Sequence, residues 1–165
     1  MIDEKWLDDI RHELERIYVE KNHDYGNSAF DTFVHYGDVA LIIRIEDKLR
    51  RLQKLKYANS MVKSESIDDT YKDAINYMII LIGCRLTGRI EYENERKTST
   101  TLGVYETIFD KAKSEPIAAR IKKYDTVTSL RDMHKKHRFR NPSIDEYIDY
   151  TVGLIYSYYY WKEGM

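Results

Sequence analysis

The stretch ESIDDTYKDAINY, residues 65–77, says most about the fold of this chain. Three acidic residues in it, Glu65, Asp69 and Asp73, are spaced by four, and Asn76 follows three residues later. Side chains three and four positions apart are neighbours on an α-helix. The spacing therefore predicts a helix that carries a stripe of oxygen-bearing side chains along one side.

An apolar run over residues 77–86 completes this helix, which we expect to extend from about Ile67 to Leu86. Ser64 or Ser66 suits the start, because a serine oxygen accepts hydrogen bonds from the free amides of a first turn. Gly88 suits the end, since glycine adopts the closing left-handed conformation. The expected buried face consists of Ile75, Met78, Ile79 and Ile82.

Apolar residues at helical spacing mark further segments on both sides of this helix. Residues 2–21 predict a helix that stops near Gly26, and residues 38–57 predict another, which would pack along Ile42, Ile45, Leu49 and Leu52. The later helical segments are 105–112, 117–130 and 144–161, with Pro116 and Pro142 near the starts of the last two. No strand pairs are predicted, so the expected fold class is all-α, with about six helices.

The polar segment 91–101 is the best candidate for a linker. It divides the chain into expected units 1–90 and 102–165, packed together as a single compact body. The sequence can be aligned with itself so that Arg44-Ile45 matches Arg120-Ile121. The same alignment matches Asp69, Tyr71 and Asp73 with Asp145, Tyr147 and Asp149. A degenerate tandem repeat and a chance agreement both account for this match.

The overall composition is that of an ordinary globular protein, because 42% of the 165 residues are hydrophobic, 33% are charged and the net charge is -1. This balance argues against disorder and against a basic nucleic-acid-binding surface, and favours a small ligand or a protein partner. The single cysteine, Cys84, excludes an internal disulfide and a cysteine-based zinc site. The chain shows neither an apolar signal region nor a membrane-spanning stretch, so a cytoplasmic location is expected.

The acidic stripe has two interpretations. Crowded carboxylates repel one another unless a cation neutralises them, and a magnesium ion with bound nucleotide phosphates would suit such a site. Alternatively, the stripe is a solvated face whose acidic residues favour the helix macrodipole at the first turn. The residues alone leave both interpretations open.

Three segments together resemble a known family. They are KNHDYG (21–26), DKLRRL (47–52) and the stretch 65–77. The combination is similar to the nucleotide-modification-associated domain of phage and bacterial proteins, which is itself similar to the all-α MazG-like nucleotide pyrophosphohydrolases. Tandem copies of the domain occur in that family, so the resemblance also favours the repeat.

The resemblance implies a MazG-like helical bundle in which acidic side chains of two neighbouring helices bind Mg²⁺. It implies cleavage of a nucleoside triphosphate between its α and β phosphates, with Glu46 or Asp47 as the catalytic base. The implied metal ligands are Glu46, Glu65, Asp69 and Asp73. The implied substrate-binding residues are Lys21, Asp24, Tyr25, Asn27, Lys48, Arg51 and Asn76. The alternatives are a plain turn at residues 24–27 and ordinary surface ion pairs such as Asp47 with Arg51.

Two function classes remain open from the sequence. The first is a magnesium-dependent pyrophosphohydrolase of phage or bacterial nucleotide metabolism that acts on a (deoxy)nucleotide. The family's association with nucleotide modification suggests that this nucleotide is a pyrimidine or a modified one. The second is a helical protein that binds or sequesters a nucleotide without turnover. It is favoured by a departure from the MazG-like Glu-x-x-Glu-Glu signature, since this chain has only Glu46 and Asp47 there. A purely structural oligomer is a third class.

Two further features have simple interpretations. The segment 144–161 has tyrosines on nearly every side, which predicts that the helix is mostly buried and favours a subunit interface of a homo-oligomer. The basic cluster from His134 to Arg140 is expected to be a solvated turn, because two histidines three apart on a polar loop are weak evidence of a metal site.

Overall fold

The computed structural model of the chain describes residues 2–25, 28–55, 62–88, 94–114, 126–136 and 142–164, with the backbone alone at 23–25, 62–65 and 94–97. Every regular element in these ranges is a helix, so the predicted all-α fold is confirmed. No helix in the described ranges is long and apolar enough to cross a membrane. Much of the predicted helix 117–130 lies outside them, as do Arg120-Ile121 and His137 to Arg140.

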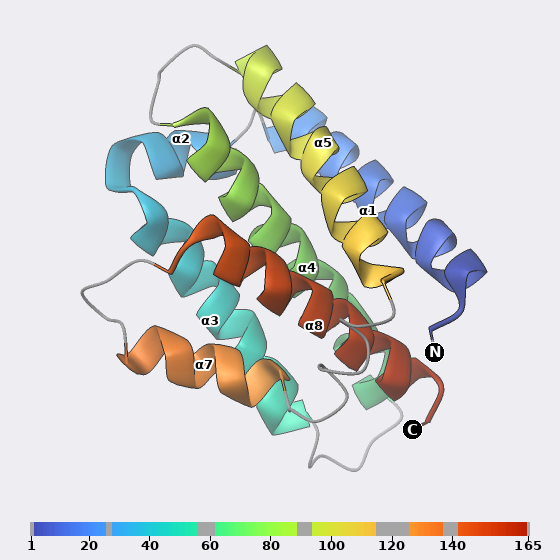
Figure 1. Cartoon of the computed structure of the whole chain (residues 1–165). Coiled ribbons are helices and arrows are strands. Elements are labelled where there is room, and N and C mark those ends of the chain that lie inside the picture. The colour runs from blue at the N-terminus through green and yellow to red at the C-terminus, as the bar shows by residue number, and fades with distance from the viewer. Residues whose placement is uncertain are drawn as a thin grey trace.

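The longest described helix, α4 (Val62–Thr87), is the centre of the fold (Figure 1). It packs against α3 (Asp38–Leu55), α5 (Asn94–Ala112) and α8 (Ile144–Lys162). Its C-terminal half is apolar all round, which is the pattern of a helix surrounded by others. The predicted face is confirmed, because Ile75, Met78, Ile79 and Ile82 are at most 1% exposed, and Ile80, Leu81 and Cys84 are buried as well.

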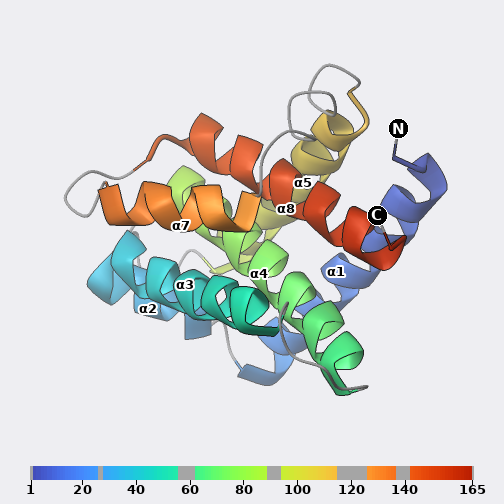
Figure 2. The same cartoon turned by 90° about the horizontal axis from the view of Figure 1, so that it is seen from below.

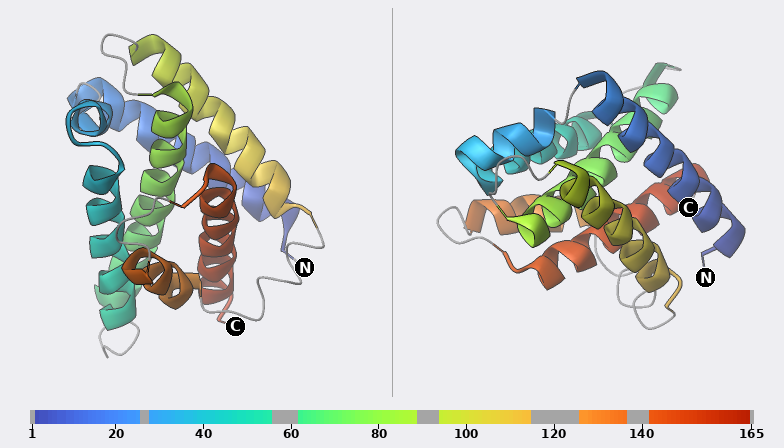
Figure 3. Two further views of the ribbon diagram at one scale, coloured as in Figure 1. Left: turned by 60° about the vertical axis from the view of Figure 1, so that its left-hand side comes forward. Right: turned by 90° about the horizontal axis from the view of Figure 1, so that it is seen from above.

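Helix pairs flank α4. α1 (Glu4–Tyr25) lies alongside α5 (Figure 3), and α3 contacts the short α7 (Thr126–Lys136) (Figure 2). α2 (Ser28–Tyr36) contacts α3 and α4. The contacts of α1 with α5, of α3 with α7 and of α4 with α8 each join the two halves of the chain. The division at residues 90 and 102 and the tandem repeat remain predictions.

The buried side of α3 consists of Leu41, Ile45, Leu49 and Leu52, each at most 6% exposed. The predicted packing face of this helix is confirmed at Ile45, Leu49 and Leu52. Ile42 is partly buried and packs against the core, whereas Leu41, four residues before Ile45, is fully buried and continues the stripe.

Several helix boundaries differ from the predicted ones. α2 was not predicted. α4 begins at Val62, so Ser64 and Ser66 lie inside the helix rather than before it. α5 begins at Asn94, so most of the predicted linker is helical. Packing against α1 and α4 accounts for this, because tertiary contacts stabilise a helix more than its own propensity does.

Other boundaries were predicted correctly. Gly88 follows α4 with a φ of 85°, the left-handed conformation expected of a closing glycine. α8 begins directly after Pro142 and Ser143, where the Ser143 side chain accepts from the Glu146 amide and Glu146 accepts from the Ser143 amide. This reciprocal capping box fixes the start of α8.

The tyrosines of α8 are buried within the chain itself. Tyr147, Tyr156 and Tyr158 are at most 1% exposed. Tyr158 packs edge-on against Trp6 of α1, with ring centroids 5.5 Å apart, and stacks on Tyr71 of α4 at 5.3 Å. The predicted burial is confirmed for these three tyrosines, because other helices of the same chain cover them. A homo-oligomer remains a prediction.

Candidate functional site

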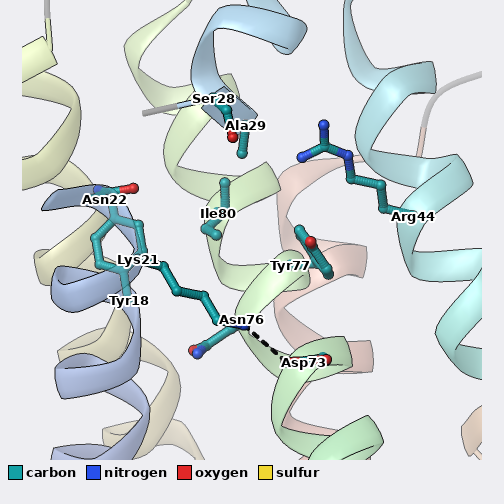
Figure 4. A pocket seen from close by; sticks show the side chains of 10 residues that line it. All are labelled: Tyr18, Lys21, Asn22, Ser28, Ala29, Arg44, Asp73, Asn76, Tyr77 and Ile80. Carbon is teal, nitrogen blue, oxygen red and sulfur yellow. Dashed lines mark hydrogen bonds and ion pairs between the residues drawn. The ribbon is translucent and has the colours of Figure 1, made fainter. Parts of the chain in front are cut away.

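A cavity of about 230 Å³ opens among α1, α2, α3 and α4. Figure 4 shows its side chains converging from these four helices. The lining residues are Tyr18, Lys21, Asn22, Ser28, Ala29, Arg44, Asp73, Asn76, Tyr77 and Ile80. Three residues predicted from the sequence, Lys21, Asp73 and Asn76, therefore lie in one place, although 52 positions separate Lys21 from Asp73.

Asp73 is held between two lysines. Its Oδ1 lies 3.3 Å from Lys21 Nζ of α1, and its Oδ2 lies 3.0 Å from Lys48 Nζ of α3. The Asp73 side chain is 27% exposed, so these pairs are only partly screened by water. Two cations thus neutralise the carboxylate that the sequence suggested as a metal ligand.

A second hollow of about 270 Å³ adjoins the first and shares Arg44 and Tyr77 with it. Its other lining residues are Asp47, Lys48 and Arg51. The Arg44 guanidinium lies 5.9 Å from the centre of the Tyr77 ring, within the range of a cation–π contact. We call the first hollow the inner cavity and the second the outer cavity.

The two cavities are positively charged in a chain whose net charge is -1. Their basic lining residues are Lys21, Arg44, Lys48 and Arg51, and their acidic lining residues are Asp47 and Asp73. The α3 residues recur at intervals of three and four, which places them on one face of that helix. Such a concentration of lysine and arginine suits an anion, above all phosphate oxygens, which the arginine fork and the lysine charge both recognise.

Glu46, a predicted base and metal ligand, lies on a different side of α3. Its carboxylate accepts from Arg131 Nε at 2.7 Å and lies 3.4 Å from His134 Nδ1, both on α7. Glu46 lines neither cavity. Asp47, the other predicted base, does line the outer cavity, but its side chain is 67% exposed. The tertiary packing therefore separates two acidic residues that are adjacent in the sequence.

The remaining predicted ligands do not complete a metal site in the described part of the chain. Asp69 is exposed and lines neither cavity. The side chains of Glu65, Asp24 and Tyr25 lie outside the described residues, as does Asn27 entirely. Among the side chains that are described, no group of three His, Cys, Asp or Glu residues is placed to hold a metal ion. Magnesium binding remains a prediction.

Arg51 and Asn76 make contacts that limit their predicted roles. Arg51 lines the outer cavity and donates to Ser66 Oγ at 2.7 Å. Asn76 is 7% exposed, and its amide bonds to the Tyr105 hydroxyl and to the Leu14 carbonyl. Both the oxygen and the nitrogen of the Asn76 amide therefore already have a hydrogen-bond partner within the protein.

The structure adds lining residues that sequence reasoning did not single out. Arg44 had a usable signal, because it continues the three-and-four spacing of Asp47, Lys48 and Arg51. Asn22 lies inside the KNHDYG segment, and its buried amide nitrogen has no hydrogen-bond partner among the described residues. Ser28 comes from the unpredicted helix α2, so only the tertiary structure reveals it.

His134 was expected in a solvated turn and instead belongs to α7, with its side chain 7% exposed. Its Nε2 is buried and unpartnered in the described region. Burial lowers the pKa of His134, and the nearby Glu46 carboxylate only partly offsets this. The histidine is therefore an inward part of the α3–α7 contact and not a surface charge.

Fold and site together define an all-α protein with two adjoining, mainly basic cavities among α1, α2, α3 and α4. Residues 21–82 match the model of a family described as nucleotide modification associated domain 1. The matched segment is less than half of the chain, yet it contains all the lining residues of both cavities except Tyr18. No curated protein and no solved structure gives a significant match.

Proposed function

We propose that this chain binds a (deoxy)nucleotide, with its phosphates in the outer cavity and its nucleoside in the inner one. The observation that carries the proposal is the cluster of Lys21, Arg44, Lys48 and Arg51 around two adjoining cavities. The match of residues 21–82 to a nucleotide-modification-associated family supports the same ligand class, because that segment contains every lining residue of the two cavities except Tyr18.

The lining of the two cavities supports this orientation. The inner cavity combines apolar side chains such as Ala29 and Ile80 with the amides of Asn22 and Asn76, which suits a base or a sugar. The outer cavity has three basic residues on one face of α3. Tyr77 borders both cavities, so its ring lies where a nucleoside would join its phosphates.

Magnesium-dependent release of pyrophosphate from a nucleoside triphosphate is the second candidate function. Asp47 and Asp73 favour it, because they place carboxylates beside the same basic residues. A bound magnesium ion would supply charge neutralisation at the phosphates. Asp73 already pairs with two lysines and Glu46 points to α7, so the described carboxylates do not form a magnesium site by themselves. Binding is therefore the primary proposal.

The Asp73→Asn variant separates the two functions. If the cavity binds phosphates without a metal, this variant should bind nucleoside triphosphates more tightly in EDTA, because Lys21 and Lys48 lose their neutralising partner. If the chain is a magnesium-dependent hydrolase, the same variant should lose pyrophosphate release.

The measurements are equilibrium binding and pyrophosphate release with the four common deoxynucleoside triphosphates, with and without magnesium. The control is Asp132→Asn, which removes an exposed carboxylate of α7. Absence of binding by the wild-type chain in every condition would overturn the proposed function.

A further inference from the structure

Tyr105 of α5 makes a hydrogen bond into the wall of the inner cavity from outside the matched segment 21–82. Its side chain is fully buried, and its hydroxyl donates to Asn76 Oδ1 at 2.6 Å. Tyr105 does not line either cavity. Its ring also packs against Tyr18, which lines the cavity, at 6.1 Å between ring centroids. The influence of its hydroxyl on a ligand would pass mainly through Asn76, because the second contact of the hydroxyl, to the Leu14 carbonyl, is longer at 3.5 Å.

The chemistry of the surrounding groups fixes which way the Asn76 amide points. Asn76 Nδ2 donates to the Leu14 carbonyl oxygen of α1 at 3.3 Å. The reverse orientation would place Oδ1 against that carbonyl, so two acceptors would face each other without a proton. Burial also raises the pKa of Tyr105 well above its ordinary value, so the phenol keeps its proton and stays a donor.

The Asn76 amide thus ties α4 to α1 and α5 at the wall of the inner cavity. Asp73 and Tyr77 lie within one turn of Asn76 on the same helix and line the cavity. Lys21, which pairs with Asp73, lies two turns after Leu14 on α1. A change at the Tyr105–Asn76 bond would therefore shift the walls that meet a nucleoside.

We propose that Tyr105 is a positioning residue of the nucleotide cavity, supplied by the second half of the chain and acting through Asn76. This inference rests on the proposed nucleotide-binding function. It predicts that loss of the Tyr105 hydroxyl weakens binding of a nucleotide more than binding of inorganic triphosphate, because the inorganic ion needs only the basic outer cavity.

The test compares Tyr105→Phe with Tyr156→Phe. Tyr156 is a matched control, since it is also buried and donates a 2.6 Å hydrogen bond, but to the Ala112 carbonyl. Tyr105→Phe should weaken binding of deoxynucleoside triphosphates about tenfold, the usual effect of leaving one buried acceptor unsatisfied. Its affinity for inorganic triphosphate should stay near the wild-type value, and Tyr156→Phe should leave both affinities unchanged.

A double variant, Tyr105→Phe with Asn76→Leu, separates positioning from stability. Removing both polar partners should recover thermal stability relative to the single variant, as expected if Tyr105→Phe leaves one acceptor unsatisfied. Nucleotide affinity is compared only between the single variants, because Asn76 itself lines the cavity. The inference would be overturned by unchanged nucleotide affinity in Tyr105→Phe, or by equal losses of affinity in Tyr105→Phe and Tyr156→Phe. In either case the proposed function would still stand if the wild-type chain binds the nucleotide. Failure of the wild-type chain to bind any nucleotide would overturn the proposed function and the inference with it.

Discussion

Lys48 Nζ lies 3.0 Å from Asp73 Oδ2, so a cation of α3 neutralises a carboxylate of α4 between the two cavities. Lys21 completes the arrangement from α1. Three helices thus contribute one charge each to a site that is partly shielded from water. An incoming phosphate would compete with Asp73 for the same two lysines.

Replacement of Lys48 by Gln is expected to weaken binding of a nucleoside triphosphate about tenfold, because a charge-assisted contact to a phosphate oxygen is lost. The salt dependence of binding should also become shallower, since one fewer charge interacts with the ligand. Isothermal titration at several salt concentrations measures both effects. Lys5→Gln is the control, because Lys5 forms an exposed pair with Asp9 at the surface of α1. Equal affinity in the Lys48→Gln and Lys5→Gln variants would contradict this assignment.

Replacement of Glu46 by Gln is expected to lower stability and leave nucleotide affinity unchanged. The Glu46 carboxylate pairs with Arg131 at 2.7 Å and lines neither cavity. Loss of a partly buried hydrogen bond between charged groups costs about 1–2 kcal/mol. Urea denaturation gives the change in the free energy of unfolding, and a titration with nucleotide gives the affinity. A large loss of nucleotide affinity or turnover without a loss of stability would instead show that Glu46 acts in the site.

Acidification should weaken the α3–α7 contact through His134. Burial lowers the pKa of His134 below its ordinary value of 6.5 in the folded chain. The unfolded chain therefore binds a proton first as the pH falls, so the contribution of His134 to stability is full above 6.5 and decreases below it. We expect the free energy of unfolding to fall as the pH drops below 6.5, and to fall less in His134→Gln. Identical pH profiles for the two proteins would argue against this.

Substitution of Gly83 by Ala is expected to destabilise the fold where α4 crosses α5. An added Cβ would overlap the Thr101 hydroxyl and lie 3.2 Å from the Thr101 Cα, so the backbone of α5 would have to move. Overpacking of this kind costs about 1–3 kcal/mol. Gly103→Ala is the matched control, because nothing lies within 4 Å of its added Cβ, and alanine there should stabilise α5 by up to about 1 kcal/mol. Thermal unfolding of both variants measures the difference, and a stable Gly83→Ala protein would refute the close crossing.

The site was predictable where its residues belong to one local pattern. Lys48 and Arg51 share a face of α3, and Arg44 extends it at the same spacing. Tyr105 was not predictable in this way, because 29 positions separate it from Asn76 and the hydrogen bond joins two different helices, α5 and α4.

The amino-acid sequence by itself determined the all-α fold class and the buried faces of α3 and α4, because a period of about 3.6 residues repeats along each segment whatever lies around it. It also brought Lys21, Asp73 and Asn76 together as candidates. Only the tertiary structure decided that Glu46 faces α7 while Asp47 borders the outer cavity, since neighbours in a helix point about 100° apart and different helices cover them. Periodicity shows which side chains share a face, but long-range packing decides what that face meets.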